Sequence, residues 1–249
     1  MNKLPITFAF FTSTKGHWGR KTDYQVTLNH WDKQIPLVVF GRRVAHLKVT
    51  PGEEDIAKSM REDLTARGFQ VIETTGGWNR GLSHGDAYLC DQITVSKNAE
   101  VYSQPYFMLV EDDSAVLSHK IPLDDLLMSG CKLLASDHET LSARFMRRGD
   151  DKGPGFPADS GTDYFWSEHV NFQPIIMRSL DYYRLCLVLE QNPEARQKVQ
   201  CEMLWRLILQ NFSRSPKKHL VWEPDYAETL HIGVKQEDYE KVVTEHKLI

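Results

Sequence analysis

Three consecutive carboxylic acids, Glu111, Asp112 and Asp113, directly follow an uninterrupted apolar run at residues 106–110. Such a run predicts a strand that is buried on both faces, as in a parallel sheet. The acids would then lie at the carboxyl edge of the sheet, where open α/β sheets bind their ligands. Crowded anions raise one another's pKa, and a divalent cation, which prefers carboxylate oxygen, would relieve the repulsion. The segment therefore indicates a site for a metal ion and a phosphate-bearing ligand.

The same acids also fit a simpler interpretation. Acidic residues often follow strands in solvated turns, or cap the N-terminus of a helix, and Ser114 could serve as such a cap. If the strand continues through the acids, Glu111 and Asp113 point to one side and Asp112 to the other. Both interpretations stay open on this segment alone, so the remaining motifs have to decide between them.

Length and composition narrow the class of protein. The chain of 249 residues is long enough for one large α/β domain, and 41% hydrophobic with 26% charged residues is ordinary for a soluble globular protein. No apolar run approaches the roughly 20 residues of a membrane span. The start of the chain at residues 1–5 lacks the form of a signal peptide. We therefore expect a cytoplasmic protein.

The cysteines are scattered and form no Cys-x-x-Cys pair, which predicts reduced thiols and argues against structural zinc. The formal net charge of −4 argues against a protein that simply coats nucleic acid. Local basic clusters could still line one anionic groove, or could be solvated surface. These clusters are Arg42 with Arg43, Arg144 with Arg147 and Arg148, and Arg214 with Lys217 and Lys218.

Strand-like and helix-like segments alternate in the first half of the chain. Ile56, Met60 and Leu64 recur at four-residue steps and predict an amphipathic helix that Gly68 ends. The alternation predicts an α/β fold with a mostly parallel central sheet, crossover helices and a Rossmann-like nucleotide-binding half. We predict strands at 5–11, 36–41, 69–73, 106–110 and 132–135, and helices at 23–31, 53–67 and about 85–97.

The second half is less regular. Residues 149–161 are rich in glycine, proline and acids and predict a mobile loop, either a lid over a site or an ordinary surface loop. A strand at 172–177 contains Pro174, which places it at a sheet edge. We predict helices at 180–190 and 193–212, a late strand at 220–222, a strand-like segment at 229–233 and a short terminal helix.

Several short motifs follow one another along the chain. They are Thr12-Ser13-Thr14, Asn79-Arg80-Gly81, Glu111-Asp112-Asp113, the strand at 171–178, the helix with Glu202, and His231-Ile232-Gly233. In the order and spacing of these motifs, over about residues 5–235, the chain resembles nucleotide-sugar-dependent glycosyltransferases of the GT-A fold. Glu111 replaces the first aspartate of their Asp-x-Asp motif, a variant similar to that of some lipopolysaccharide glycosyltransferases.

The resemblance implies one GT-A-like domain over residues 1–249, with a donor-binding half at about 1–120 and an acceptor-side half at about 121–249. It also implies that Asp113 binds Mn²⁺ or Mg²⁺, which bridges the phosphates of a nucleotide-sugar, expected to be a UDP-sugar. Glu111 or Asp112 would contact its ribose or uracil. His231 would be the second metal ligand, since a neutral imidazole binds divalent metals. The alternative for His231 is a hydrogen-bonded core histidine.

Glu202 is the candidate general base, which would take the proton of the acceptor hydroxyl in an inverting transfer. Its alternative is a salt-bridged helix face, because Lys198, Glu202 and Arg206 stand at four-residue steps. Asp163 is the reserve candidate for the catalytic carboxylate, together with Asp159 beside the loop at 149–161.

The resemblance assigns the remaining motif residues to the donor. Thr12, Ser13 and Thr14 would surround the nucleoside with hydroxyl and backbone groups, and Arg80 would pair with a donor phosphate. Two tryptophans could stack on a sugar or a base, or could belong to the core. They are Trp78 and Trp166.

We therefore predict a hexosyl- or pentosyltransferase that moves a sugar from a nucleotide-sugar to a hydroxyl acceptor. The acceptor is open between a glycan, a lipopolysaccharide-type molecule and a hydroxymethylated DNA base, as in phage and base-J-type transferases, which would require base flipping. A nucleotidyltransferase is the alternative enzyme, although residues 12–16 are a weak version of its glycine-rich basic loop. A non-catalytic nucleotide-sugar-binding module is the third hypothesis, and the intact acidic motif argues against it.

Overall fold

Two apolar runs of the sequence lie side by side at the centre of the molecule. The first forms β1 (Leu4–Ser13) and the second, which leads into the acids, forms β4 (Tyr106–Glu111). They pair in parallel with Phe11 opposite Glu111. Nearly every residue of both strands is buried, because helices cover both faces of the sheet, as a parallel sheet requires.

A computed structural model gives this arrangement for most of the chain. It describes residues 3–15, 24–77, 82–118, 120–147, 155–156, 164–167, 170, 172, 174–215, 218–223 and 225–231. The central sheet runs in the order β3-β2-β1-β4-β10-β6-β11-β9-β8, and a small second sheet runs in the order β5-β12-β7.

The predicted α/β class is confirmed, and four neighbouring strands form a continuous parallel block in the central sheet. Strands β3, β2, β1 and β4 are parallel to one another, whereas β10 is antiparallel to both its neighbours. The remaining strands of both sheets are β2 (Phe40–Val49), β3 (Gln70–Thr75), β5 (Ser114–Ser118), β6 (Ser142–Arg144), β7 (Met146–Arg147), β8 (Gly155–Phe156), β9 (Tyr164–Ser167), β10 (Ile175–Arg178), β11 (His219–Trp222) and β12 (Ala227–His231).

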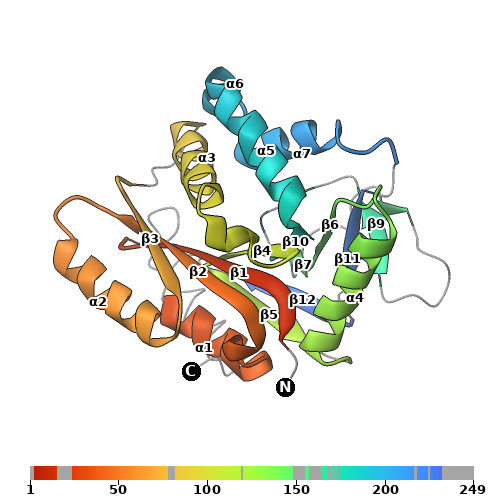
Figure 1. The fold of residues 1–249 in the computed structure, drawn as a ribbon, viewed down its shortest axis with the longest axis horizontal. Helices are drawn as coiled ribbons and strands as arrows, with labels where there is room; N and C mark the ends of the chain where they lie inside the picture. Colours follow the sequence, from red (N-terminus) through yellow and green to blue (C-terminus); the bar gives the residue numbers. More distant parts are fainter. Residues whose placement is uncertain are drawn as a thin grey trace.

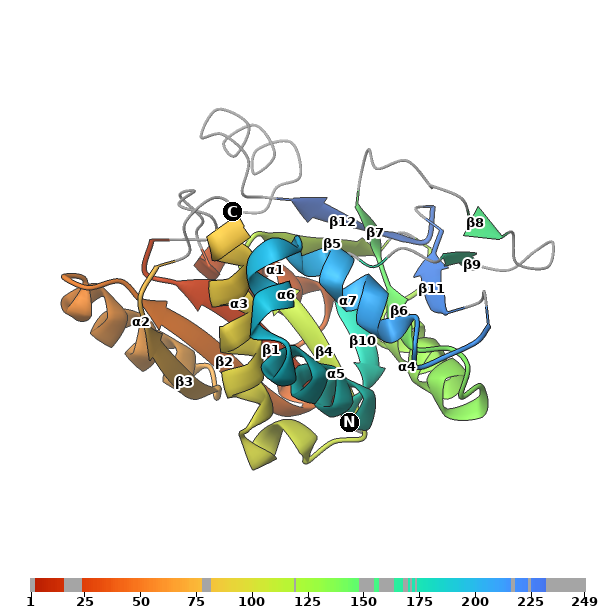
Figure 2. The same ribbon diagram turned by 90° about the horizontal axis from the view of Figure 1, so that it is seen from above.

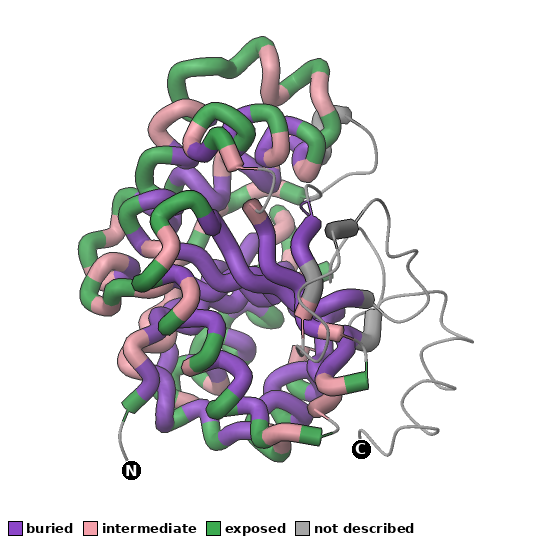
Figure 3. Tube along the Cα trace, turned by 90° about the vertical axis from the view of Figure 1, so that its right-hand side faces the viewer, coloured by how far each residue is buried: buried purple, intermediate pink, exposed green. Residues whose placement is uncertain are grey.

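Helices form a layer on each face of the central sheet (Figures 1 and 2). Alternate residues of β4 divide between two cores, with Met108 and Val110 facing one and Phe107 and Leu109 the other. The first face carries α1 (Tyr24–Gln34), α2 (Glu54–Ala66) and α4 (Leu123–Ser136), and the second carries α3 (Leu82–Ser96), α5 (Ser179–Gln191), α6 (Pro193–Lys198) and α7 (Cys201–Leu209). Figure 3 shows the buried strands enclosed by helices whose outer sides are exposed.

Two predicted strands are wrong. Residues 37–39 form a short 3-10 helix, and the strand begins only at Phe40. It continues through Arg42 and Arg43, because pairing with β1 overrides their polar character. Residues 132–135 belong to α4, whose buried residues recur at helical spacing. In the sequence, Gly130 interrupts the apolar pattern of this helix. In the structure Gly130 is a buried helical residue, and a Cβ atom at this position would lie 3.0 Å from the Trp222 ring.

Two further predictions about the second half are corrected. The strand that follows Pro174 lies between β4 and β6 and not at an edge, because the proline precedes its first paired residue, Ile175. The helix predicted at 193–212 is two helices, since the chain leaves helical geometry at Val199 and the Gln200 side chain caps α7. Within the part of the chain that is described, no helix is long and apolar enough to cross a membrane.

Candidate active site at the carboxyl edge of the sheet

The three acids lie where the strand order changes direction. From β1 the chain adds β2 and then β3 on one side, whereas β4 lies on the other side. Ligands of open α/β sheets bind outside the carboxyl ends of the strands at such a switch point. Glu111 is the last residue of β4, and Asp112 and Asp113 form the turn that leads into β5. All three acids are buried, which excludes the solvated turn.

Asp112 is anchored to β1. Its Oδ2 accepts a hydrogen bond from the Thr12 hydroxyl at 2.7 Å, and its N–H donates to the Phe11 carbonyl at 3.0 Å. Asp113 lies one residue further, and the Ser114 hydroxyl donates to its Oδ1 at 3.3 Å. Thr12 therefore holds the acidic turn against β1, while its predicted contact with a nucleoside stays a prediction.

Glu111 faces the opposite side of the sheet, toward α3 and α7. Burial raises the pKa of Glu111 well above its usual value, and the charges of Asp113, Glu202 and Asp112 act in the same direction. A hydrogen bond from the Tyr88 hydroxyl opposes this shift. Glu111 and Asp112 point to different faces as predicted, although the strand ends at Glu111 and does not continue through the acids. The causes of the pKa shift also show that like charges converge at this edge.

Glu202 lies in the first turn of α7, within electrostatic reach of Glu111. The Phe172 N–H donates to its Oε1 at 3.1 Å and Gln200 Nε2 to its Oε2 at 2.9 Å. Lys198 instead pairs with Glu194 at 3.3 Å, since α6 ends before α7 begins. Lys198 therefore does not contribute to the salt-bridged helix face that was the alternative for Glu202. We call Glu111, Asp112, Asp113 and Glu202 the acid cluster.

Strand β12 brings the late histidine segment to the acids. Its register with β5 places the backbone of His231 opposite Ser114, the residue that follows Asp113. The side chain of His231 lies outside the described atoms. Among the residues that the structure describes, no three His, Cys, Asp or Glu side chains are arranged to hold a metal ion by themselves.

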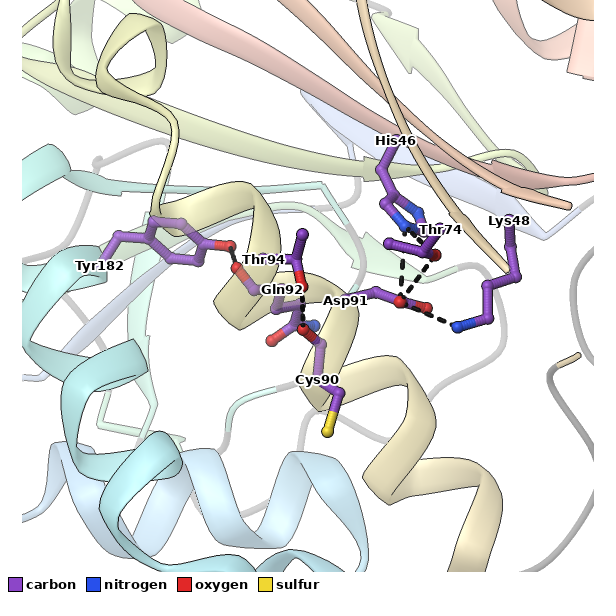
Figure 4. Close-up of polar contacts among 8 residues, drawn as sticks. All are labelled: His46, Lys48, Thr74, Cys90, Asp91, Gln92, Thr94 and Tyr182. Carbon is purple, nitrogen blue, oxygen red and sulfur yellow. Dashed lines mark hydrogen bonds and ion pairs between the residues drawn. The ribbon is translucent and has the colours of Figure 1, made fainter. Parts of the chain in front are cut away.

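A second polar cluster, the Lys48–Asp91 network, lies at the carboxyl ends of β2 and β3 (Figure 4). Lys48 Nζ lies 2.9 Å from Asp91 Oδ1, and the Thr74 hydroxyl donates to the same oxygen at 2.9 Å. His46 Nε2 lies 2.8 Å from the Thr74 oxygen and 3.5 Å from Asp91 Oδ1. These four residues define the network.

Opposite charges dominate the Lys48–Asp91 network. Burial by itself would raise the pKa of Asp91, but hydrogen bonds and charge from His46 and Lys48 outweigh burial and hold that pKa below its usual value. The sequence analysis missed this cluster. Lys48 and Asp91 gave no distinct signal, because both of their elements carry other polar residues and nothing in the sequence joined positions 43 residues apart.

Residues near the end of β1 connect the two clusters. Ser13 is buried opposite Lys48 in the register of β1 with β2. The N–H of Thr14 donates to the Lys48 carbonyl at 3.0 Å, and its Oγ1 accepts from the Thr50 N–H at 3.0 Å. The segment predicted to surround a nucleoside therefore lies between the two polar clusters.

Other predicted residues fall elsewhere. Trp166 is buried in the main core, edge-on to Tyr164 at 5.7 Å, so it is a core tryptophan. Arg42 and Arg43 lie in the first half of β2, away from its carboxyl end, and Arg42 pairs with Glu100 at 3.0 Å. Four candidates and two segments lie outside the described residues. They are Trp78, Arg80, Asp159 and Asp163, most of the loop at 149–161, and the tail after His231.

No protein-family model and no curated protein sequence matches this chain. The fold is similar to that of a 4-diphosphocytidyl-2C-methyl-D-erythritol synthase from Anaerococcus prevotii, with a TM-score of 0.52 and 13% identity over 97% of this chain and 96% of that one. It is also similar to a putative glucose-1-phosphate thymidylyltransferase from Bacillus anthracis, solved with a sucrose, with a TM-score of 0.57 and 8% identity over 98% and 96% of the two chains. At these identities the similarity establishes a shared fold and leaves the reaction to be argued from the site.

Proposed function

We propose that this protein is a glycosyltransferase that moves a sugar from a nucleotide-sugar, expected to be a UDP-sugar, to a hydroxyl acceptor. One observation carries the proposal. Three elements distant in sequence meet around the three acids: the end of β4 with Glu111, the strand β12 whose His231 pairs with Ser114 after Asp113, and α7, whose Glu202 lies within electrostatic reach of Glu111. The site thus joins carboxylates and a histidine-bearing strand at the ligand-binding edge of the sheet.

A divalent cation suits this set of donors. Carboxylate oxygen from Asp113 and an imidazole nitrogen from His231 would be its protein ligands, and the remaining positions would be left to phosphate oxygens and water. The like charges that raise the pKa of Glu111 repel one another, and a bound cation would relieve this repulsion. When bound, Mn²⁺ or Mg²⁺ would act as a Lewis acid on the departing nucleoside diphosphate.

We propose that Glu202 takes the proton of the acceptor hydroxyl. Two N–H donors fix the orientation of its carboxylate, and its side chain is only partly buried, so a hydroxyl can approach it. In an inverting transfer the acceptor oxygen attacks the anomeric carbon while its proton moves to Glu202. The bond between that carbon and the donor phosphate oxygen then breaks. Asp163 stays the reserve candidate for the catalytic carboxylate.

The donor would extend from Asp113 along the carboxyl ends of β1 and β2. Ser13 and Thr14 lie there beside Lys48. Arg80 is proposed to contact the donor phosphates. Because Arg42 and Arg43 lie away from this edge, we favour a glycan or lipopolysaccharide-type hydroxyl over a hydroxymethylated DNA base as the acceptor.

A nucleotidyltransferase is the second candidate, favoured by the fold that this chain shares with the putative thymidylyltransferase. The two reactions differ in their products. Glycosyl transfer releases a nucleoside diphosphate from a nucleotide-sugar, whereas nucleotidyl transfer to a sugar phosphate releases pyrophosphate from a nucleoside triphosphate.

The test combines binding with product analysis. The purified protein is heated with Mn²⁺ and a panel of nucleotide-sugars, and we expect a higher melting temperature with at least one donor. That donor is then incubated with glycan, lipopolysaccharide-type and hydroxymethylated-DNA acceptors, and the products are read by mass. No stabilisation by any donor would contradict the transferase, and pyrophosphate release from a nucleoside triphosphate would favour the alternative. Donor binding without any product would indicate a non-catalytic module.

A further inference from the structure

Among the described residues, strand β5, which follows the acids, is bordered by another strand on only one side. Within that part of the chain it forms the edge of the small sheet and pairs with β12 alone. Alternate residues of a strand direct their backbone N–H and C=O groups to the same edge. Ser114, Val116 and Ser118 therefore share one edge of β5, and helix α1 lies along β5 (Figure 1).

Side chains of α1 take the place of the missing strand. Trp31 Nε1 donates to the Ser114 carbonyl at 3.0 Å, and His30 Nε2 lies 2.7 Å from the Val116 carbonyl oxygen. At the far end of β5, the Ser118 N–H donates to Gln34 Oε1 at 3.4 Å. Each alternate residue of β5 is thus bonded to α1.

A fourth contact extends this series into the acidic turn. The Thr27 hydroxyl donates to the Asp112 carbonyl at 2.5 Å. Thr27, His30, Trp31 and Gln34 stand at helical spacing on one face of α1, and the first three are buried. A threonine inside a helix commonly bonds to a carbonyl of the preceding turn. Here the hydroxyl instead reaches across to another element.

These contacts bracket Asp113. Thr27 fixes the carbonyl before it and Trp31 the carbonyl after it, and the latter belongs to Ser114, the residue opposite His231. We propose that α1 is a positioning element and that Thr27 and Trp31 are positioning residues, which set the backbone of Asp113 for binding a divalent cation with a nucleoside diphosphate. This inference rests on the proposed function.

The alternative is that α1 only protects a sheet edge. Both roles predict a loss of stability when a contact is removed, but only positioning predicts a separate loss of metal affinity. Groups that orient metal ligands typically change affinity about 10- to 100-fold when they are removed. The test therefore measures metal binding on protein that is fully folded.

Thr27→Val removes the hydroxyl and keeps the shape of the side chain, and Thr27→Ser restores the hydroxyl. Thr94→Val is the matched control, because Thr94 is an exposed helical threonine whose hydroxyl bonds to the Cys90 carbonyl at 2.9 Å on α3. Free Mn²⁺ is measured by electron paramagnetic resonance with UDP present. We expect about a tenfold weaker Mn²⁺ affinity for Thr27→Val, and near wild-type affinity for Thr27→Ser and Thr94→Val.

Trp31→Phe is a second variant in case Thr27→Val does not fold. It removes the N–H that binds Ser114 and keeps an aromatic ring against Phe8, and we expect a similar loss of affinity. Unchanged Mn²⁺ affinity in the folded variant would overturn the positioning role alone. An equal loss in Thr27→Val and Thr27→Ser would also overturn it. If the wild-type protein bound no Mn²⁺ with UDP, both this inference and the metal-dependent function would be overturned.

Discussion

Two buried carboxylates at the same edge of the sheet have opposite surroundings. Asp91 lies beside Lys48 and His46, and its pKa is held below the usual value although burial acts in the other direction. Burial also acts on Glu111, but there the neighbouring charges are those of Asp113, Glu202 and Asp112, and its pKa is raised. Burial raises the pKa of both groups, so the sign of the neighbouring charges accounts for the opposite directions of their pKa shifts.

This difference suggests separate roles. The Lys48–Asp91 network links β2, β3 and α3, so it stabilises the edge on which a ligand would lie. The acid cluster concentrates negative charge, which costs stability in the isolated protein and would favour the proposed cation. Perturbed carboxylates occur in structural networks as well as in active sites, and the two clusters represent one of each kind in our proposal.

The largest expected effect is on ligand binding. Asp113→Ala should abolish the Mn²⁺-dependent stabilisation by the donor, because it removes the proposed carboxylate ligand. Its free energy of unfolding without metal should stay near the wild-type value or rise, since one of several like charges is lost. Thermal unfolding with and without Mn²⁺ and donor measures both. Donor-dependent stabilisation equal to that of the wild type would remove Asp113 from the metal site.

Glu202→Gln should separate binding from chemistry. The amide keeps the size of the side chain but cannot accept the acceptor proton, so kcat should fall about 10²- to 10⁴-fold. Donor binding should be preserved. Rates are measured by release of the nucleoside diphosphate. An unchanged kcat would show that Glu202 is not the general base, and Asp163 would then be the next carboxylate to test.

Asp91→Ala should show the reverse pattern. Removing one partner of a buried ion pair typically costs about 3–5 kcal/mol, because the other charge stays buried. Urea unfolding measures the loss. Glu73→Ala is the matched control, since its pair with Arg61 is much more exposed and should contribute under about 1 kcal/mol. Equal effects of the two substitutions would contradict the assigned role of the network.

The smallest effect is the dependence of this loss on pH. The folded pKa of Asp91 lies below its unfolded value of about 3.9, so its contribution is fully present above that pH and is lost as the pH falls through the folded pKa. The difference in unfolding free energy between the wild type and Asp91→Ala should therefore be constant near neutrality and shrink in acid. A difference that grows below pH 4 would contradict the lowered pKa.

The sequence by itself determined the local features of the site. The apolar run before Glu111 specified a doubly buried strand, and this placed the acids at a carboxyl edge. The apolar face of α2 was also predictable from Met60 and Leu64, which are both buried, although Ala57 is buried in place of Ile56, which is 49% exposed. Such features follow from periodicity and backbone geometry, which act over a few neighbouring residues.

Only the tertiary structure decided which distant residues meet. The pairing of Ser114 with His231, the approach of Glu202 to Glu111, and the contact of Thr27 with Asp112 each join separate elements. The sequence pattern carries no signal for these pairs, because strand register and helix packing depend on how all the buried faces fit together at once. The acids were visible in the sequence, whereas their neighbours, and hence their proposed chemistry, came from the fold.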